Sequence, residues 1–386
     1  MTTMPLDSAP GRRRRLTLDL PLVMAVASLG VLGLLNLRSA VSVVNLQFYE
    51  TQLTWFGVGG LTALVVWLVD HRVFLRYSYA AYGLVVLLLI LVLAVGRQAN
   101  QATRWLLLGP VSIQPSEFMK LALILCIARI FHGDVRPEPR TLRDFLLPAV
   151  LTAIPTVLVL KQPDLGTALI YPLILVSMAM VLRVRARSVL LAFGGLLASL
   201  PLAWSSLHGY QRERVVTLFA SLFSSERLDV QDAAWQTTQS KIAVGSGHIF
   251  GKGFLHGTQN QLGFVPFQHT DFPFAVWGEE HGFVGSALLI ALYLFVVLWA
   301  LRIAARARDR FGALVAVGVA AMLFWHVAIN MGMVLGLLPV VGVTLPLFSY
   351  GGSSVLANLV GVGLLLSIAA HRAAAPWEGL GPRHGL

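Results

Sequence analysis

Charged side chains and cysteine are both scarce in this sequence. Charged residues make up 12% of its 386 residues, about half of what soluble domains carry. Hydrophobic residues make up 56%, and the mean hydropathy is +0.75. Cys126 is the only cysteine, which excludes an internal disulfide and a metal site built on cysteines. This composition excludes an ordinary soluble enzyme and predicts an integral membrane protein.

Apolar runs long enough to cross a membrane recur along the whole chain. A helix needs about 20 mostly apolar residues to cross about 30 Å of hydrocarbon. We therefore predict an all-α polytopic integral membrane protein of one domain, residues 1–386, with ten transmembrane helices. The predicted spans are 20–35, 53–69, 77–95, 114–131, 145–160, 167–182, 188–207, 283–301, 312–335 and 354–371. Around them we expect an N-terminal arm (1–16), one large extracytoplasmic loop between helices 7 and 8 (208–282) and a flexible tail (373–386).

Lys and Arg residues set the orientation of these helices. If the N-terminus, with Arg12 to Arg15, lies inside, most of the 29 Lys and Arg residues fall in inside segments, as the positive-inside rule requires. An even number of helices then places both termini in the cytoplasm. The net charge of +11 is thus mainly an orientation signal. The Arg clusters are short loops without interleaved aromatic residues, so we predict no nucleic-acid partner.

Five polar clusters, together rich in Gly and Pro, interrupt the apolar sequence. They are 104–105 with 114–117, 162–164, 239–257, 269–271 and 349–354. The predicted topology places all five on the outer face of the membrane. A membrane protein that gathers its polar residues on one face is predicted to carry out its chemistry there.

The start of the fourth predicted helix carries a charge pair. Pro115 suits the first turn of a helix, and Ser116 and Glu117 complement the positive end of the helix dipole. Lys120 follows Glu117 by three residues, so both lie on one face of the helix. An internal ion pair is one interpretation. A site for an anionic phosphate is the other, because charges within a membrane tend to mark ligand pathways.

The polar turns on either side of this helix allow two interpretations each. Arg104 and Trp105 fit an interfacial aromatic belt as well as a functional site. Asp164 is predicted to cap the helix that follows it. The turn that carries Ser349 and Ser353 fits capping too, although its two adjacent glycines would permit close approach of the backbone to a ligand.

The long loop carries the candidate catalytic residue. Asp271 lies among phenylalanines and prolines, and an aspartate in a partly dry, apolar setting can act as a general base. A turn-forming role is the alternative. The glycines of 245–253 do not match a P-loop or a dinucleotide fingerprint, and they predict an irregular segment that lines a cavity. His326 and Asn330, one turn apart in the ninth helix, are predicted to form an interhelical polar pair.

Together these motifs resemble the SEDS family (shape, elongation, division and sporulation), most closely its RodA branch. The resemblance covers nearly the whole chain. It rests on Arg104-Trp105, Gln114 to Lys120, Gln162 to Thr167, Gly251-Lys252-Gly253, Gly257-Thr258-Gln259, His269 to Phe272, and Gly332 through Ser354. The chain departs from the family pattern twice. Phe267 stands where a Glu is usual, and Pro273 replaces an aliphatic residue.

The resemblance implies a peptidoglycan glycosyltransferase, multi-pass in the bacterial cytoplasmic (inner) membrane, that polymerises lipid II into β-1,4 glycan strands during cell elongation. Asp271 would be the general base, and Lys120 and Arg104 would contact the pyrophosphate. The other implied substrate-binding residues are Trp105, Glu117, Gln239, Lys241, Ser349 and Ser353. A divalent cation, Mg²⁺ or Mn²⁺, is implied by the resemblance alone.

The resemblance also implies partners. These are a class B penicillin-binding protein, other elongation-complex proteins and membrane lipid. Small residues between 312 and 321 of the ninth span would let a partner helix approach closely. A lipid II flippase, which would use the same intramembrane charges without forming a bond, is the alternative function. A secondary transporter would show paired broken helices in two halves, and a scaffold would need neither Asp271 nor Lys120.

Overall fold

The computed structural model describes residues 17–42, 45–99, 102–108, 111–133, 136, 138–191, 194–195, 198, 212, 216 and 232–371. The first helices are α1 (Leu20–Ala40), α2 (Gln47–Leu68) and α3 (His71–Val95). Three short strands follow, β1 (Arg97–Ala99), β2 (Ala102–Leu108) and β3 (Val111–Ile113). The rest of the described chain is helical: α4 (Pro115–His132), the 3-10 turn η1 (Leu142–Phe145), α5 (Leu146–Leu160), α6 (Leu165–Met180), α9 (Asp232–Ser246), α10 (Thr258–Gln261), α11 (Pro273–Ala305), α12 (Arg310–Val334) and α13 (Gly352–Ala370).

Seven helical segments in the described part of the chain are long and apolar enough to cross a membrane. α6 is apolar but shorter, and α4 carries Glu117, Lys120 and Arg129 along its length. Every predicted span coincides with a helix except 188–207, most of which lies outside the described residues. The chain is therefore a helical, multi-pass membrane protein. The number of ten spans stays a prediction.

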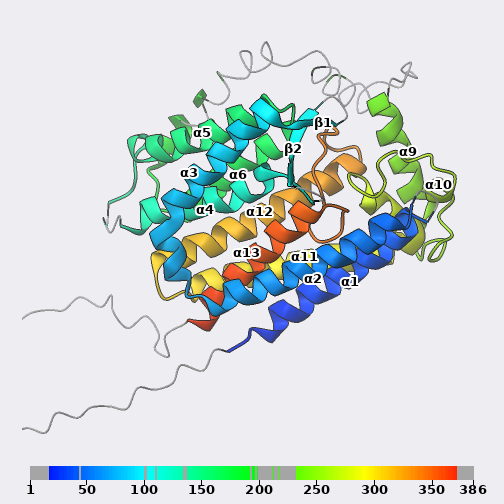
Figure 1. Ribbon diagram of the computed structural model, residues 1–386, viewed down its shortest axis with the longest axis horizontal. Helices are drawn as coiled ribbons and strands as arrows, with labels where there is room; N and C mark the ends of the chain where they lie inside the picture. Colours follow the sequence, from blue (N-terminus) through cyan, green and yellow to red (C-terminus); the bar gives the residue numbers. More distant parts are fainter. Residues whose placement is uncertain are drawn as a thin grey trace, which may run out of the picture.

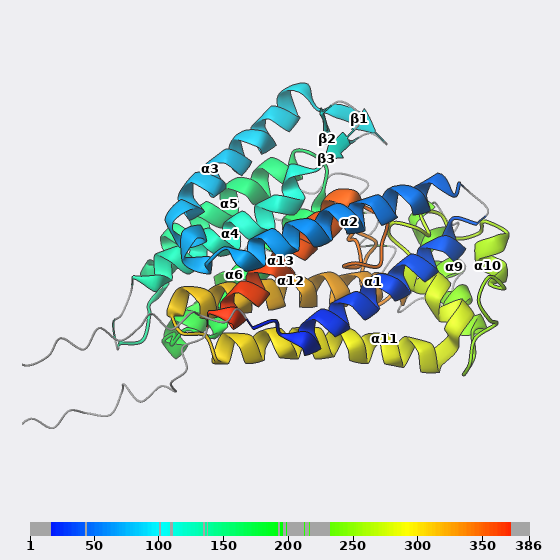
Figure 2. The same cartoon turned by 60° about the horizontal axis from the view of Figure 1, so that its bottom comes forward.

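α12 runs through the middle of the bundle (Figures 1 and 2) and packs against α4, α6, α11 and α13. In its most apolar stretch 72% of residues are buried, against 17% for α2 at the periphery. Small residues allow α12 to pack this closely against its neighbours. A Cβ built on Gly318 would lie 2.5 Å from the side chain of Ile124 on α4, so a larger residue would not fit there. The prediction that the small residues of this helix receive a partner protein is therefore wrong. They admit neighbouring helices of the same chain.

A three-stranded antiparallel sheet precedes α4, with β2 in the middle. Leu106 pairs with Ile113 between β2 and β3, and Arg97 pairs with Trp105 between β1 and β2. The all-α prediction is therefore incomplete. The sheet carries Arg104 and Trp105, and β3 leads directly into α4. It thus fixes where the 104–105 motif lies relative to the start of that helix.

α11 is kinked at Gly282, whose backbone angles are φ 64° and ψ −160°. The predicted boundary of the long loop falls at this kink, and the helix continues before it to Pro273. Segment 247–253 packs into the kink, since a Cβ built on Gly282 would lie 2.3 Å from the backbone nitrogen of Gly251. Of the predicted loop 208–282, the structure describes 212, 216 and 232–282. Part of the segment that we predict to be irregular is helical, because α9 extends to Ser246.

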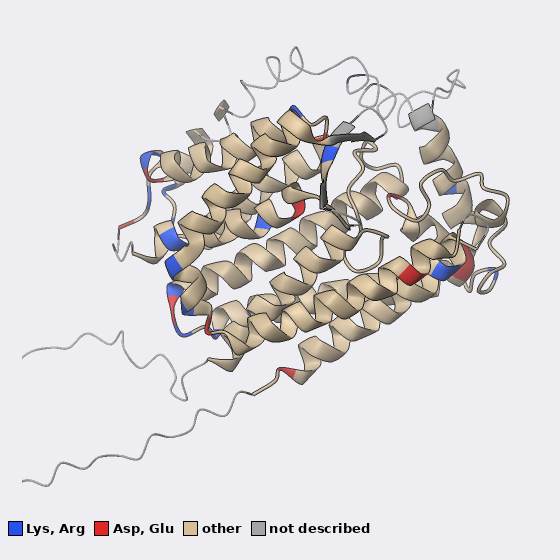
Figure 3. Ribbon diagram, viewed as in Figure 1, with Lys and Arg blue, Asp and Glu red and all other residues tan. Residues whose placement is uncertain are grey.

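Glu279 organises this outer segment from the first part of α11. Its buried carboxylate accepts hydrogen bonds from the Lys252 ammonium at 2.7 Å, from the Thr258 hydroxyl at 3.1 Å and from the Gln259 amide at 3.0 Å. Figure 3 shows many Lys and Arg residues at the opposite end of the bundle, where α4 ends, and fewer at the end that carries α9 and α10. This distribution agrees with the orientation that the positive-inside rule predicts, in which the end of the bundle rich in Lys and Arg faces the cytoplasm.

Candidate functional site

The start of α4 carries a buried ion pair. Pro115 occupies the first helical turn, where its missing N–H is not needed. Lys120 Nζ lies 2.8 Å from Glu117 Oε2, and their side chains are 1% and 6% exposed. The predicted placement of both residues on one helix face is confirmed.

His326 of α12 completes this group. Its Nε2 lies 2.8 Å from Lys120 Nζ, and its Nδ1 lies 2.7 Å from the Met322 carbonyl. Nδ1 therefore carries the proton and donates to that carbonyl, while Nε2 accepts from the ammonium. Of the predicted interhelical polar pair, His326 makes its contact with α4, which confirms the prediction for this residue. Asn330 bonds instead to the carbonyls of Asp271 and Val343, which lie outside the helices. The Lys120 ammonium is thus enclosed by protein groups and has no open face toward a phosphate in this structure.

Asp271 lies half-buried in the turn before α11. Its backbone nitrogen donates to the Phe267 carbonyl at 2.9 Å. Asn330 of α12 donates to the Asp271 carbonyl at 2.9 Å and to the Val343 carbonyl at 2.7 Å. A Cβ built on Gly342 would lie 3.6 Å from Asp271 Oδ2, so the carboxylate lies over the backbone of that glycine. Asn330 and the backbone at Gly342, both far from Asp271 in the sequence, therefore contact this residue in the folded protein.

α12 connects Asp271 with the buried ion pair. His326 contacts Lys120, and Asn330, one helical turn further along, bonds to the Asp271 carbonyl. Residues four apart on a helix lie on the same face. The candidate base and the buried cation are therefore positioned by one rigid element.

The Asp164 turn joins Arg104 to the start of α4. The Asp164 carboxylate caps α6 by accepting from the Thr167 amide at 3.2 Å, which confirms the capping prediction. It also accepts from the Gln114 side chain at 3.2 Å. Arg104 donates to the carbonyl oxygens of Gln162, at 3.3 Å, and of Pro163. The Arg104 side chain is 31% exposed, so it keeps an accessible face beside this turn.

The turn before α13 lies between these two groups. Ser353 Oγ accepts from the Gln114 amide at 3.0 Å, and Ser349 Oγ accepts from the Leu345 amide at 2.8 Å. The Tyr350 amide donates to the His269 carbonyl at 2.7 Å. Both serines are buried, and their hydroxyls bond to backbone groups of the protein. The turn therefore ties the start of α4 to the segment that carries Asp271.

Two of the predicted substrate-binding residues lie elsewhere, on α9. Gln239 is buried, and Lys241 is exposed. A Cβ built on Gly336, just beyond α12, would lie 3.0 Å from Lys241 Cδ. Ser240 donates to the Val334 carbonyl at 2.8 Å and so fixes α9 to the outer end of α12. No described contact joins Gln239 or Lys241 to the segment of Asp271.

An aromatic group borders the candidate base. The ring of His269 stacks on Phe48, with 5.1 Å between centroids, and lies 6.0 Å from the ring of Tyr350. Burial lowers the pKa of His269 and raises the pKa of Tyr350. Both side chains are therefore neutral near pH 7. Trp105 is half-buried on β2.

The donor groups at this site do not fit a protein-held divalent cation. Glu117 is paired with Lys120, and the Asp164 carboxylate caps α6. In the described part of the chain, the one group of three metal-ligating side chains lies elsewhere and consists of Asp70, His71 and His371.

Sequence patterns reveal some of these site residues and miss others. Asn330 and His326 are polar residues in a membrane span, which is a signal of function, but nothing in the sequence names their partners. Gln52 of α2 is missed altogether. It is buried, donates to the Ser349 carbonyl at 3.0 Å and accepts from the Gly351 amide at 3.1 Å.

Comparison with known proteins identifies the family. The model of the FtsW, RodA and SpoVE family, described as cell cycle proteins, matches residues 18–374. The chain belongs to this family. It is the SEDS family that the motifs indicate, and relatives named MrdB and RodA place the chain in the RodA branch.

Three similar proteins agree with this assignment. The peptidoglycan glycosyltransferase MrdB of Escherichia coli K12 is 40% identical over 356 residues, which cover 92% of this chain and 94% of that protein. A chain in a peptidoglycan synthase complex, solved for its structural coordination of polymerization and crosslinking, is 36% identical. The match has a TM-score of 0.79 and covers 93% of this chain and all of that one. The rod shape determining protein RodA of Thermus thermophilus is 34% identical, with a TM-score of 0.67 and coverage of 93% and 98%.

Proposed function

We propose that this peptidoglycan glycosyltransferase of the RodA branch polymerises lipid II at the outer face of the cytoplasmic membrane during cell elongation, with Asp271 as the general base. The observation that carries the proposal is the setting of Asp271. Its carboxylate is half-buried over Gly342, and its backbone is fixed by Asn330. A fixed, partly desolvated carboxylate suits proton transfer.

The reaction joins two lipid-linked disaccharides. Asp271 accepts the proton of the 4-hydroxyl of the acceptor GlcNAc, and that oxygen forms a bond to the anomeric carbon of a second MurNAc. The bond from this carbon to the phosphate oxygen breaks, and polyprenyl pyrophosphate leaves with the bonding electrons. One displacement converts the α-linked phosphate into a β-1,4 link, so the enzyme inverts the configuration.

Negative charge on the leaving group needs stabilisation by positive charge. Arg104 is the cation that we assign to this role, because its guanidinium is 31% exposed beside the Asp164 turn. We assign Trp105, its half-buried neighbour, to stack on a sugar ring. Gln239 and Lys241, on α9, would contact parts of the substrate further from Asp271.

Lys120 has a different role in this proposal. Its ammonium is enclosed by Glu117 and His326, so we assign it as a positioning residue rather than a phosphate ligand. Glu117 orients Lys120, and the pair fixes α4 against α12. Ser349 and Ser353 hold the turn between α4 and the Asp271 segment.

The deciding experiment compares wild type with Asp271→Asn on purified lipid II. Asn keeps the size of the side chain but cannot take a proton, so polymer formation should fall by about 10²–10⁴-fold while the protein stays folded. Asp164→Asn is the matched control, because Asn caps a helix about as well as Asp, and it should retain most activity. If the protein were a lipid II flippase, the wild type would form no polymer. Polymerisation by Asp271→Asn at the wild-type rate would remove Asp271 from the base role.

The ten-helix topology with both termini inside is part of this proposal. The placement of Lys and Arg at the end of the bundle where α4 ends supports it. In a Cys126→Ala background, Phe250→Cys, at an 80% exposed position, should react with an impermeant thiol reagent in intact cells. Arg136→Cys should react only after the membrane is opened. The reverse pattern would contradict the topology and the outer site with it.

A class B penicillin-binding protein is the proposed partner, with other elongation-complex proteins around it. Support comes from the similar chain in a complex that coordinates polymerization and crosslinking. A transpeptidase domain at the outer face would lie near segment 247–263. A photo-crosslinking residue at Phe250 should therefore capture the transpeptidase in native membranes, and one at Arg136 should not. Equal capture at both positions, or at neither, would contradict the proposal.

A further inference from the structure

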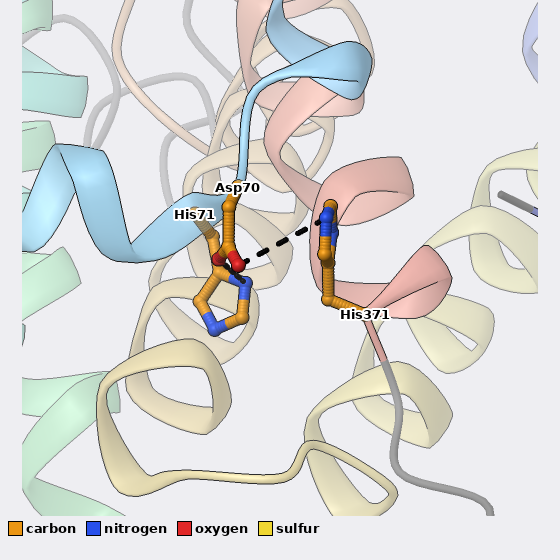
Figure 4. Close-up of side chains that lie close together, drawn as sticks. All are labelled: Asp70, His71 and His371. Carbon is orange, nitrogen blue, oxygen red and sulfur yellow. Dashed lines mark ion pairs between the residues drawn. The ribbon is translucent and has the colours of Figure 1, made fainter. Parts of the chain in front are cut away.

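Three side chains with metal-binding atoms meet at the end of the bundle opposite α9 and α10. Asp70 caps the start of α3, His71 is the first residue of that helix, and His371 directly follows α13 (Figure 4). His71 Nδ1 lies 3.3 Å from Asp70 Oδ1, and His371 Nε2 lies 3.9 Å from Asp70 Oδ2. One ligand atom from each residue lies within 4.8 Å of the other two. The site is remote from Asp271 and plays no part in the proposed reaction.

The hydrogen bonds behind these side chains fix which histidine nitrogens carry protons. His71 Nε2 lies 3.0 Å from Asp309 Oδ2, so this nitrogen donates to the carboxylate. His371 Nδ1 lies 2.7 Å from the Ser367 carbonyl, so it too is the donor. Each ring then turns the lone pair of its other nitrogen toward Asp70. Metal-bound histidines have this arrangement, in which the second nitrogen donates to a carboxylate or a backbone carbonyl.

The surroundings of His71 call for a positive charge, either a proton or a metal ion, between its ring and Asp70. The residue is 2% exposed, and its Nδ1 has no hydrogen-bond partner. A neutral ring would direct this lone pair at the Asp70 carboxylate, which is repulsive. A proton on Nδ1 or a metal ion between the two residues removes the repulsion. A proton would serve His71 alone and would leave His371 Nε2, 3.9 Å from the same carboxylate, to bond with water. A metal ion would engage all three residues.

We propose that Asp70, His71 and His371 bind a divalent metal ion of the zinc class. Two imidazoles and one carboxylate form a ligand set that zinc prefers. Bonds of about 2.0–2.1 Å in a tetrahedron place ligand atoms about 3.3–3.5 Å apart. His71 and Asp70 already meet this spacing. His371, whose Nε2 lies 3.9 Å from the other Asp70 oxygen, has to move inward, since the three ligand atoms lie within 4.8 Å of one another. The Asp70 side chain is 30% exposed, so water can take the fourth position.

A bound ion would join helix ends that are far apart in the sequence. It would connect the start of α3 to the end of α13, and Asp309 would extend the connection to α12. Asp309 caps α12 by accepting from the Gly312 amide at 2.8 Å. Arg72 Nε lies 3.7 Å from Asp309 Oδ2 and balances part of the negative charge. We therefore expect the ion to stabilise the folded protein.

The test uses the full chain in detergent, carrying a purification tag without histidines and stripped of metal with a chelator. Titration with ZnCl₂ should show saturable binding of one equivalent and a rise in the midpoint of thermal unfolding. Co²⁺ should give the visible absorption of a tetrahedral complex. Mg²⁺ should do neither, because it prefers oxygen ligands in octahedral geometry.

Variants separate this site from other histidines. His371→Gln should abolish the saturable binding, and Asp309→Asn, which keeps the helix cap, should weaken it about 10–100-fold. His256→Gln, at an exposed histidine on the other end of the bundle, should bind as wild type does. Equal binding by His371→Gln and wild type would overturn the proposal. So would the absence of saturable binding by wild type, which would assign a proton to His71 instead.

Discussion

Replacement of Lys120 by methionine would leave the Glu117 carboxylate in the interior without its partner. The two side chains are 1% and 6% exposed, and their charged atoms are 2.8 Å apart. Removal of one member of a buried ion pair costs about 3–5 kcal/mol, mainly because the other charge stays desolvated. Since a domain is stable by about 5–15 kcal/mol, Lys120→Met should lower the midpoint of thermal unfolding markedly.

A double variant separates the structural from the catalytic contribution of the pair. Glu117→Leu combined with Lys120→Met removes both charges and keeps the volume, which is often close to neutral for stability. His326 Nε2 would still lose its donor, at a cost of about 1–3 kcal/mol. The double variant should therefore be more stable than Lys120→Met alone. If the pair only holds α4 against α12, polymerisation of lipid II should recover together with stability.

The assay is thermal unfolding in detergent, with polymer formation measured on the same preparations. Arg136→Met is the matched control. Its partner is Asp144, at 2.9 Å, but the Arg136 side chain is 58% exposed, so the loss should stay within about 1 kcal/mol. Equal stability of Lys120→Met and wild type would refute the argument. A double variant that is stable but inactive would show that the ammonium itself serves the reaction.

Three further predictions follow from single contacts. Gly166→Ala would place a Cβ 2.6 Å from the Val341 carbonyl and should destabilise by about 1–3 kcal/mol, whereas Gly60→Ala, which meets nothing within 4 Å, should not lower the unfolding midpoint. Asn330→Leu leaves two carbonyls without donors; each costs about 1–3 kcal/mol, and polymer formation should fall because the Asp271 segment loosens. The folded pKa of His269 is lowered by burial, so its contribution should be complete above about pH 6.5 and be lost as pH falls below that value; His269→Phe should flatten this part of the stability profile.

Local patterns predicted the features that depend on neighbouring residues in the chain. Apolar runs located the helices, because a membrane span needs a fixed length of apolar side chains. The spacing of Glu117 and Lys120 predicted that they share one helix face, with an ion pair as one of two interpretations, and the position of Asp164 before an apolar run predicted its cap. The contact between Glu117 and Lys120 and the cap of Asp164 on Thr167 each join residues three positions apart, a spacing that the helical repeat determines.

Features that depend on distant parts of the chain were not predicted. The contact between Lys120 and His326 joins residues that are 206 positions apart, and no local pattern names that partner. The small residues of α12 predicted close helix packing correctly but not the neighbour, because glycine admits a helix of the same chain as readily as one of another protein. The three-stranded sheet was missed because its strands are three to seven residues long. The Gly109-Pro110 pair in the sequence is a turn signal that could have indicated it.

The role of α12 explains why residues at both ends of the bundle depend on one helix. Asp309 caps its first turn, His326 meets the buried ammonium, and Asn330 holds the carbonyl of Asp271. A helix rises by about 1.5 Å per residue, so the first and last of these lie about 30 Å apart on one rigid element. His326 and Asn330 are separated by only one turn, about 6 Å. A shift of α12 along its axis would therefore move His326 and the Asp271 segment together, because both are attached to this helix. A change in α4 alone would instead move Lys120 relative to Asp271. For this reason we expect the α4–α12 contact, more than the position of α12 itself, to set the geometry of the site.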